Sequence, residues 1–222
     1  MALLLAIDPD PAKQRLTGLQ AAGLIRRTPM LATAPGGYQI TTAGLAAIAS
    51  DLPPPRLDPD RYQHDIGAAW LWLAATKGGT FGPVEQVLSE REMRAHDNRR
   101  NAAEPEARPP TSTPDITQPT GPCFGVRPGG TEAPPSTRLH YPDLFLITSA
   151  GQVPIELELS RPHAERLAAN MSGYAAQPNI RGVLYMTHDQ PIARLVETTA
   201  ARLGISKLVH LQRIKLQAAE PA

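Results

Sequence analysis

The sequence contains very little cysteine, few aromatic residues and almost no net charge. A single cysteine, Cys123, stands among 222 residues, which excludes a disulfide framework and a zinc site built on cysteines. Aromatic residues make up 5% of the chain, so a core must depend on Leu, Ile, Val and Ala. Lys and Arg number 22 against 21 Asp and Glu. That balance excludes a strongly basic, histone-like nucleic-acid binder, although it permits a local basic face.

Long hydrophobic runs are also missing. No apolar stretch approaches the ~18 residues that a membrane helix needs. The apolar start over 1–7 ends at Asp8 and lacks the basic region and the cleavage site of a signal peptide. We therefore expect a soluble, cytoplasmic protein with no membrane partner.

Residues 1–56 predict a small unit of a helix, a hairpin and a second helix. Asp10 suits the N-cap of the first helix and Gly23 suits its end. Thr41 or Thr42 suits the cap of the second helix. In chain order, the expected elements are a helix over 11–22, strands over 24–30 and 37–40, and a helix over 43–49.

This order of elements resembles the second half of a winged helix-turn-helix domain. In such domains a helix enters the major groove and the hairpin forms the wing. The resemblance implies that Lys13, Gln14 and Arg15 face DNA and that Arg26 and Arg27 meet phosphates. Because a complete winged helix has two further helices before the recognition helix, we expect a partial unit. The alternative is a helix and hairpin packed on the next domain, with ordinary surface arginines.

Residues 57–222 predict a mixed α/β domain, so the chain as a whole has the pattern of an α+β fold. A stretch rich in Pro and Gly, at about 98–137, predicts a mobile insert because it has few large apolar residues to bury. Ser160 suits the cap of a helix that buries Leu167, Met171 and Tyr174. The other expected elements are a helix over 60–76, a strand or short helix over 84–93, strands over 138–148, 153–159, 182–187 and 207–214, and a helix over 191–203.

Three carboxylates are expected to converge at one edge of the sheet. Glu156 and Glu158 share a face of their strand because side chains alternate, and Asp143 lies on the preceding strand. Like charges so close are costly without a cation, and oxygen ligands of this kind suit Mg²⁺ or Mn²⁺. The three residues are therefore candidate metal ligands for metal-assisted phosphodiester hydrolysis. The alternative is a solvated strand face without activity.

The pattern Pro142-Asp143 followed by Glu156-x-Glu158 resembles the core of PD-(D/E)xK nucleases. Glu158 stands where that core has a lysine that orients the attacking water. His163 is the best substitute near neutral pH, because arginine does not deprotonate. The resemblance thus implies catalytic roles for Asp143, Glu156, Glu158 and His163. Four arginines could also touch a phosphate backbone, with scattered surface charge as the alternative: Arg91, Arg94, Arg99 and Arg100.

The whole chain resembles the bacterial replication-relaxation family, whose members pair a winged helix with a nuclease-like domain and occur on plasmids and conjugative elements. The matching pieces are LQAAGLIRR, YQITTAGLAAI, QHD, SEREMR, YPD and IELELS. The resemblance implies a DNA-associated protein of a mobile element, acting in replication, relaxation, transfer or their regulation, with DNA and other mobile-element proteins as partners. The alternatives are a Mg²⁺-dependent endonuclease and a non-enzymatic module for protein–protein assembly.

Overall fold

The computed structural model describes residues 9–29, 36–56, 58–77, 81–107 and 124–214. It divides into two compact units, Met1–Lys77 and Gly78–Ala222, which are described separately below. The chain has the α+β fold that the sequence predicts, with helices, a small two-stranded sheet and a larger mixed sheet. Among the described residues, no helix combines the length and the apolar character needed to cross a membrane.

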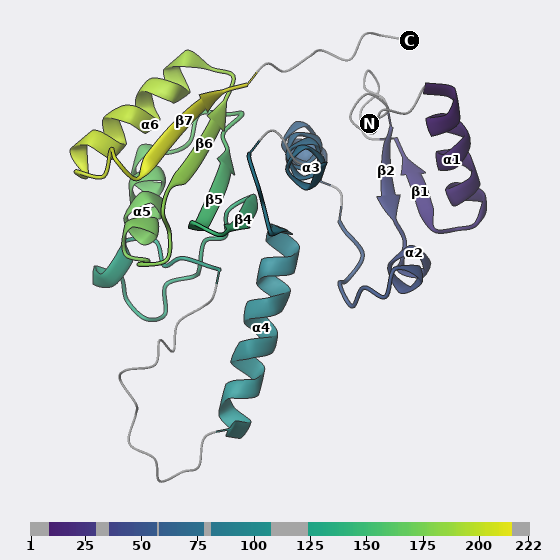
Figure 1. The fold of residues 1–222 in the computed structure, drawn as a ribbon, viewed down its shortest axis with the longest axis horizontal. Helices are drawn as coiled ribbons and strands as arrows, with labels where there is room; N and C mark the ends of the chain where they lie inside the picture. The colour runs from purple at the N-terminus through teal and green to yellow at the C-terminus, as the bar shows by residue number, and fades with distance from the viewer. Residues whose placement is uncertain (1–8, 30–35, 57, 78–80, 108–123, 215–222) are drawn as a thin grey trace. The chain divides into compact units, whose positions relative to one another are not determined.

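The first unit contains the predicted helix, hairpin and second helix (Figure 1). The hairpin strands are antiparallel, and Thr41 is the N-cap of the second helix, where its side chain accepts a hydrogen bond from Gly44 N at 3.1 Å. The helix predicted at 60–76 also belongs to this unit, whereas the sequence analysis placed it in the following domain. The elements are α1 (Pro9–Ala21), β1 (Ile25–Thr28), β2 (Gly37–Ile40), α2 (Thr42–Ala47), η1 (Pro59–Arg61) and α3 (Tyr62–Lys77).

A glycine allows α2 to pack closely on the hairpin. A Cβ at Gly44 would lie 2.1 Å from Leu24 O and 2.7 Å from Ile40 Cγ1. Leu45, the next residue, is 5% exposed and belongs to the core of the unit. The contact between α2 and the hairpin therefore requires the residue without a side chain at position 44.

The second unit is built on a mixed sheet with the strand order β3-β4-β5-β6-β7 (Figure 1). The strands β3, β4 and β5 pair antiparallel, and β5, β6 and β7 run parallel. The tight turn after β4 explains the antiparallel pair, while helical crossovers produce the parallel strands. The elements are β3 (Gln86–Ser89), α4 (Glu90–Ala107), η2 (Gly130–Glu132), β4 (Leu144–Thr148), β5 (Gly151–Leu157), α5 (Ala164–Ala175), β6 (Val183–Thr187), α6 (Gln190–Arg202) and β7 (Val209–Arg213).

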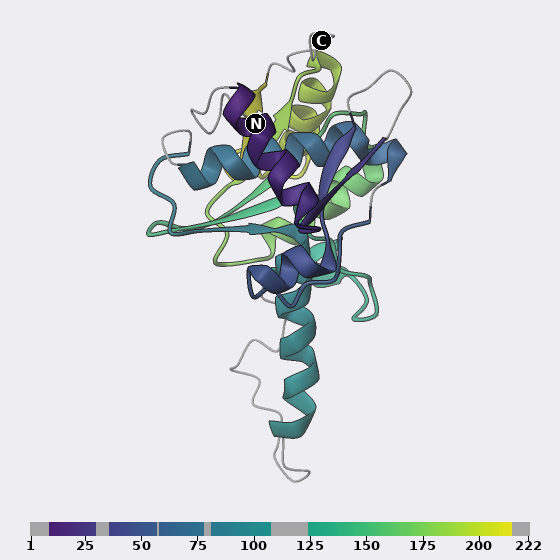
Figure 2. The same cartoon turned by 90° about the vertical axis from the view of Figure 1, so that its right-hand side faces the viewer.

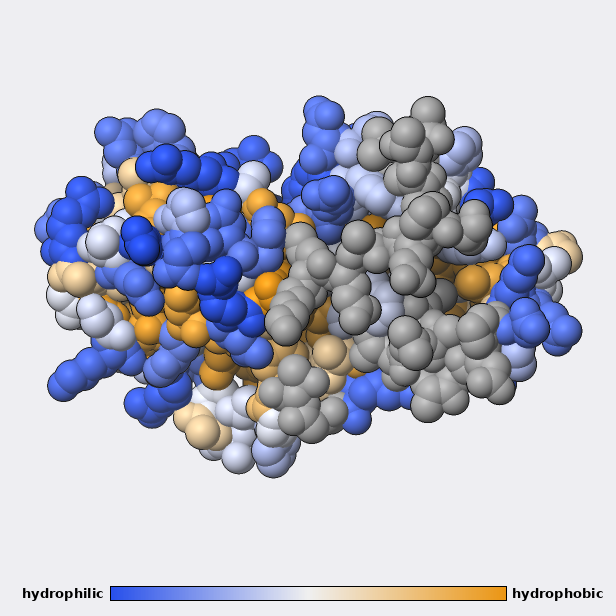
Figure 3. All heavy atoms as spheres, turned by 90° about the horizontal axis from the view of Figure 1, so that it is seen from above, coloured by the Kyte–Doolittle hydropathy of each residue, from blue (hydrophilic) through white to orange (hydrophobic). Residues whose placement is uncertain are grey.

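The main core of this unit lies where α5 and α6 cover the parallel strands. Leu167, Met171 and Tyr174 are each at most 2% exposed, which confirms the buried face that their spacing predicts. The N-cap of α5 is His163, so the prediction that Ser160 caps this helix is wrong. In the space-filling view, the left-hand part of the molecule shows hydrophobic residues between hydrophilic ones (Figure 3).

The structure differs from the predicted mobile insert at both of its ends. Residues 98–107 continue α4, which projects away from the sheet (Figure 2). At the other end, Val126 pairs with His140 in an isolated antiparallel bridge, and Gly129 N donates to Ala169 O at 2.8 Å. These hydrogen bonds help to offset the conformational entropy that is lost when the segment is ordered. Its composition alone suggested that this loss would not be compensated. The middle of the predicted insert, 108–123, lies outside the described residues.

Candidate functional site

Two of the predicted carboxylates lie at the same end of neighbouring strands. Leu144 pairs with Ile155, Asp143 directly precedes Leu144, and Glu156 directly follows Ile155. On its other side Glu156 pairs with Tyr185 of β6. Residues paired in this way share a face of the sheet. We refer to Asp143, Glu156 and Tyr185, together with His140 and Tyr174, as the Glu156 cluster.

Glu156 is buried and serves as an acceptor for two donors. It is 6% exposed. Its Oε1 lies 2.6 Å from His140 Nε2 and also accepts a hydrogen bond from the Tyr174 hydroxyl. Tyr174 comes from α5, so this helix is joined to β5 through a polar contact in addition to its apolar face. One carboxylate oxygen therefore joins a loop residue, a strand and a helix.

The surroundings raise the pKa of both donors. Burial alone would lower the pKa of His140, but the nearby charge of Glu156, the hydrogen bond to it and the charges of Asp143 and Glu90 together raise this pKa above 6.5. For Tyr174, burial comes first and the charge of Glu156 second, and both raise the pKa of its hydroxyl well above 10.0. The cluster therefore holds one carboxylate oxygen between an imidazole and a phenol whose pKa values are both raised.

Tyr185 brings a second buried phenol to the cluster. It is 1% exposed, and its hydroxyl has no hydrogen-bond partner within the described part of the chain. Burial raises the pKa of this hydroxyl well above 10.0, and the charges of Glu156 and Glu158 add to the effect. Tyr185 is therefore neutral and contributes packing, while Tyr174 supplies the hydrogen bond.

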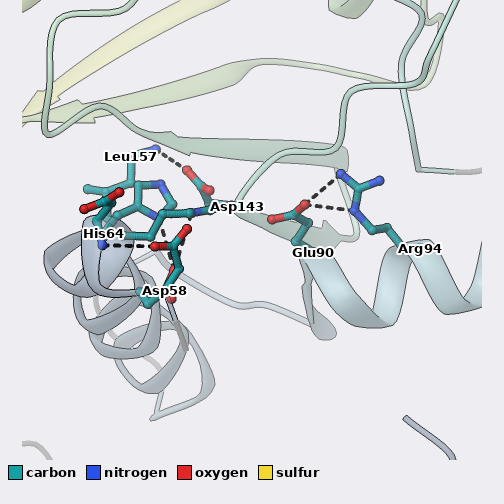
Figure 4. A network of polar contacts seen from close by, with 9 residues as sticks. Asp58, His64, Glu90, Arg94, Asp143 and Leu157 are labelled. Atoms are coloured by element: carbon teal, nitrogen blue, oxygen red, sulfur yellow. Dashed lines mark hydrogen bonds and ion pairs between the residues drawn. The ribbon is translucent and has the colours of Figure 1, made fainter. Parts of the chain in front are cut away.

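Asp143 contributes to the backbone pairing at the end of β5. Its Oδ2 accepts a hydrogen bond from Leu157 N at 2.8 Å (Figure 4). Glu158 follows directly after β5, and its backbone N–H donates to Met186 O. The structure thus places Asp143 and Glu156 at the same end of β4 and β5. Glu158 lies two residues after Glu156, just beyond the end of β5.

The predicted metal site of Asp143, Glu156 and Glu158 stays a prediction. In the described ranges, no group of three or more His, Cys, Asp or Glu side chains could hold a metal ion. Glu156 instead offers an oxygen to His140 and Tyr174. The donor set is that of a buried polar network, so we derive no catalytic step through Mg²⁺ or Mn²⁺.

A different histidine from the predicted one meets the carboxylates. His163 is exposed at the N-cap of α5, where its side chain makes no capping hydrogen bond. His140 instead reaches Glu156, from a position three residues before Asp143 in the sequence. Its place in the same short segment as Asp143 is the signal that could have identified it. Tyr174 was predicted as a core residue, and its hydroxyl contact required the three-dimensional structure.

A buried aspartate in α4 supports the segment that carries His140. Asp97 is fully buried and accepts hydrogen bonds from Phe124 N at 3.2 Å and Gly125 N at 3.0 Å. Burial, the charge of Asp97 and a hydrogen bond to it raise the pKa of Tyr141 to about 12. Because residue 126 pairs with His140, the contacts of Asp97 help to hold the imidazole beside Glu156.

Arg94 forms an ion pair within α4 and a cation–π contact with Tyr141 outside it. Arg94 Nε lies 2.8 Å from Glu90 Oε1 (Figure 4). The Arg94 guanidinium also lies over the Tyr141 ring, 4.3 Å from its centroid. Arg94 is therefore engaged within the unit and is a poor candidate for the phosphate contact that the sequence analysis considered.

The predicted DNA-binding helix presents its polar residues to solvent. Lys13, Gln14 and Arg15 are all exposed on α1, while Leu16 is half-buried. Across α1, the hairpin and α2, residues 9–47 contain four basic residues and one acidic residue. This local excess of positive charge is hidden in the near-neutral total of the chain.

The two arginines that were expected to meet phosphates lie in the first strand of the hairpin. Arg26 and Arg27 are neighbours in β1, so their side chains lie on opposite faces of the hairpin. Arg26 Nε donates to Gln39 Oε1 at 3.2 Å, and Arg27 pairs with Tyr38. Both arginines are exposed, and their predicted phosphate contacts stay a prediction.

Comparisons of the chain with protein-family models, with curated proteins and with solved structures found no match.

Proposed function

We propose that this chain is a DNA-binding protein of a plasmid or conjugative element, acting in replication, relaxation, transfer or their regulation. The observation that carries the proposal is the first unit, in which a helix with exposed Lys13, Gln14 and Arg15 is followed by a hairpin and a capped helix. Lysine and arginine bind phosphates, and arginine and glutamine bind base edges in the major groove. The mobile-element context rests on the resemblance to the replication-relaxation family.

Binding without cleavage is the first choice because of the Glu156 cluster. The carboxylate that a nuclease would offer to a metal ion accepts hydrogen bonds from His140 and Tyr174. These contacts give the acidic residue a structural role.

Salt-dependent binding of a labelled DNA duplex by the full chain tests the proposal. The double variant Lys13→Gln/Arg15→Gln removes two cations from α1 and should weaken binding about tenfold or more. If both residues contact phosphates, the slope of log affinity against log salt should fall by about 1.8. The matched control, Arg194→Gln/Arg202→Gln, removes two exposed arginines from α6 and should bind like the original protein. Equal affinities for the original protein and the α1 variant would contradict the role of α1.

A Mg²⁺-dependent endonuclease is the second candidate, favoured by Asp143, whose carboxylate accepts a hydrogen bond from Leu157 N, next to Glu156 in β5. Supercoiled plasmid incubated with the protein and Mg²⁺ or Mn²⁺ tests it, with EDTA and Asp143→Ala as controls. Nicking that needs the metal and is abolished by Asp143→Ala would establish this activity. Intact plasmid in every arm, together with salt-sensitive binding, would support the first proposal.

A further inference from the structure

One side of α3 carries an apolar stripe that remains largely exposed. Ile66 is 40% exposed and Trp70 is 39% exposed, whereas Ala75 on the opposite side of the helix is 3% exposed. The residues of the stripe share one face because they follow the spacing i, i+3, i+4 and i+7. We call them the α3 stripe: Ile66, Ala69, Trp70 and Leu73.

The composition of the α3 stripe suits a protein partner better than nucleic acid. Residues 66–76 carry no charge, so this part of the helix offers phosphates no cation. Trp70 is one of only two tryptophans in the chain, and tryptophan is enriched at the centres of protein interfaces. Single exposed apolar residues are common, but a continuous apolar stripe marks a contact surface.

The charges at the two ends of α3 favour a second copy of this helix in the antiparallel direction. The beginning of the helix is acidic, because Asp58, Asp60 and Asp65 stand there with Arg61, which pairs with Asp65. The last turn carries Lys77. An antiparallel pair brings Lys77 of each copy to the acidic end of the other and opposes the two helix dipoles. A parallel pair would bring ends of like charge together.

The side chains of the α3 stripe also complement one another in such a pair. With a twofold axis between residues 69 and 70, Ala69 of each copy lies opposite Trp70 of the other. Ile66 of each copy then lies opposite Leu73. Helices pack with their axes about 8–10 Å apart, and a small residue opposite a large one fills the space between them without a void. The same stripe therefore serves both copies, as a twofold interface requires.

We propose that the α3 stripe is a self-association surface, on which two copies of this chain pair through antiparallel α3 helices. The proposal goes beyond DNA binding and does not depend on it. Each copy contributes one helix of 16 residues, which makes a small interface. Small interfaces are typical of weak complexes, so we expect a dimer that forms at high protein concentration and dissociates on dilution.

Sedimentation equilibrium of the full chain over a range of concentrations tests the proposal. Ala69→Glu places a charge at the centre of the stripe and should raise the Kd of the dimer at least about tenfold. The matched control is Ala164→Glu, the same substitution at an exposed position in the first turn of α5, which should dimerise like the original protein. A monomer at every concentration, or a dimer that Ala69→Glu leaves unchanged, would overturn the proposal.

Disulfide crosslinking tests the antiparallel direction, with Cys123→Ser as the background. Ala69→Cys should crosslink under oxidising conditions, because the two copies of residue 69 meet near the twofold axis. Ile66→Cys should not, because the two copies of residue 66 are then about 10 Å apart along the helices, whereas a disulfide joins Cα atoms at most about 7 Å apart. Crosslinking at both positions would indicate parallel helices and overturn the arrangement.

The melting temperature of Ala69→Glu in dilute solution distinguishes a second copy from a contact within the chain. Glutamate is a good helix former, so at an exposed position it should change the melting temperature by less than about 4 °C. A larger decrease in the dilute monomer would show that another segment of the same chain covers the stripe. That result would also overturn the proposal.

Discussion

Removing the Glu156 carboxylate should destabilise the second unit strongly. The side chain is buried and accepts from Tyr174 and His140. A hydrogen bond to a charged group contributes about 1.5–3 kcal/mol. Breaking a buried pair by removing one partner costs about 3–5 kcal/mol. Because the His140 side chain is 26% exposed and regains water, we expect Glu156→Ala to cost about 3–4 kcal/mol. Glu156→Gln keeps the shape and one acceptor, so its cost should be about half as large.

Urea unfolding followed by far-ultraviolet circular dichroism measures this cost. Both tryptophans of the chain, Trp70 and Trp72, lie in the first unit. Their fluorescence therefore follows the unfolding of the first unit, apart from that of the second. Glu197→Ala, at an exposed position on α6, is the matched control and should change stability by less than about 0.5 kcal/mol. A metal-binding carboxylate facing Asp143 in metal-free protein would be repelled, and its removal would stabilise the fold. An increase in stability for Glu156→Ala would therefore refute the network interpretation.

Three further predictions concern other parts of the structure. Tyr174→Phe should cost about 1.5–3 kcal/mol because Glu156 loses a donor, whereas Tyr185→Phe should be neutral or slightly stabilising because its hydroxyl has no described partner; equal losses in urea unfolding would contradict the assignment of roles. The raised pKa of His140 means that its pair with Glu156 stabilises the fold fully below pH about 6.5, the unfolded value, and that this stabilisation is lost as pH rises through the higher folded value. The stability gap between the original protein and His140→Gln should thus shrink with increasing pH, and a gap that widens would oppose the account. Gly44→Ala should destabilise the first unit by about 1–3 kcal/mol through its clash with the hairpin, while Gly18→Ala, with open space around it, should stabilise α1 by about 0.5–1 kcal/mol; tryptophan fluorescence during unfolding distinguishes these two results.

Local patterns in the sequence predicted much of the fold. The alternation in residues 153–159 correctly placed Glu156 on one face of a strand, and the helical spacing of Leu167 and Met171 correctly identified a buried face. The strand pattern repeats every two residues and the helix pattern every 3.6 residues, so both can be recognised in the sequence. Thr41 was likewise predictable as a cap, because its role depends on a residue three positions away.

Contacts between distant segments account for what the sequence did not predict. The continuation of α4 through a stretch that composition marked as mobile depends on buried Met93 and on Asp97, which bonds to Gly125. The approach of His140 to Glu156 likewise depends on a bridge with Val126. No local pattern marks such partners, because a polar residue in a polar helix gives no sign that it is buried.

The most direct test of the central claim is the affinity of the full chain for a labelled duplex as salt is raised, measured in EDTA. The account predicts binding that weakens linearly on a log–log plot. If Lys13 and Arg15 both contact phosphates, the slope should have a magnitude of at least about 1.8. No binding at low salt, or an affinity that does not change with salt, would contradict the claim that this protein binds DNA through exposed cations.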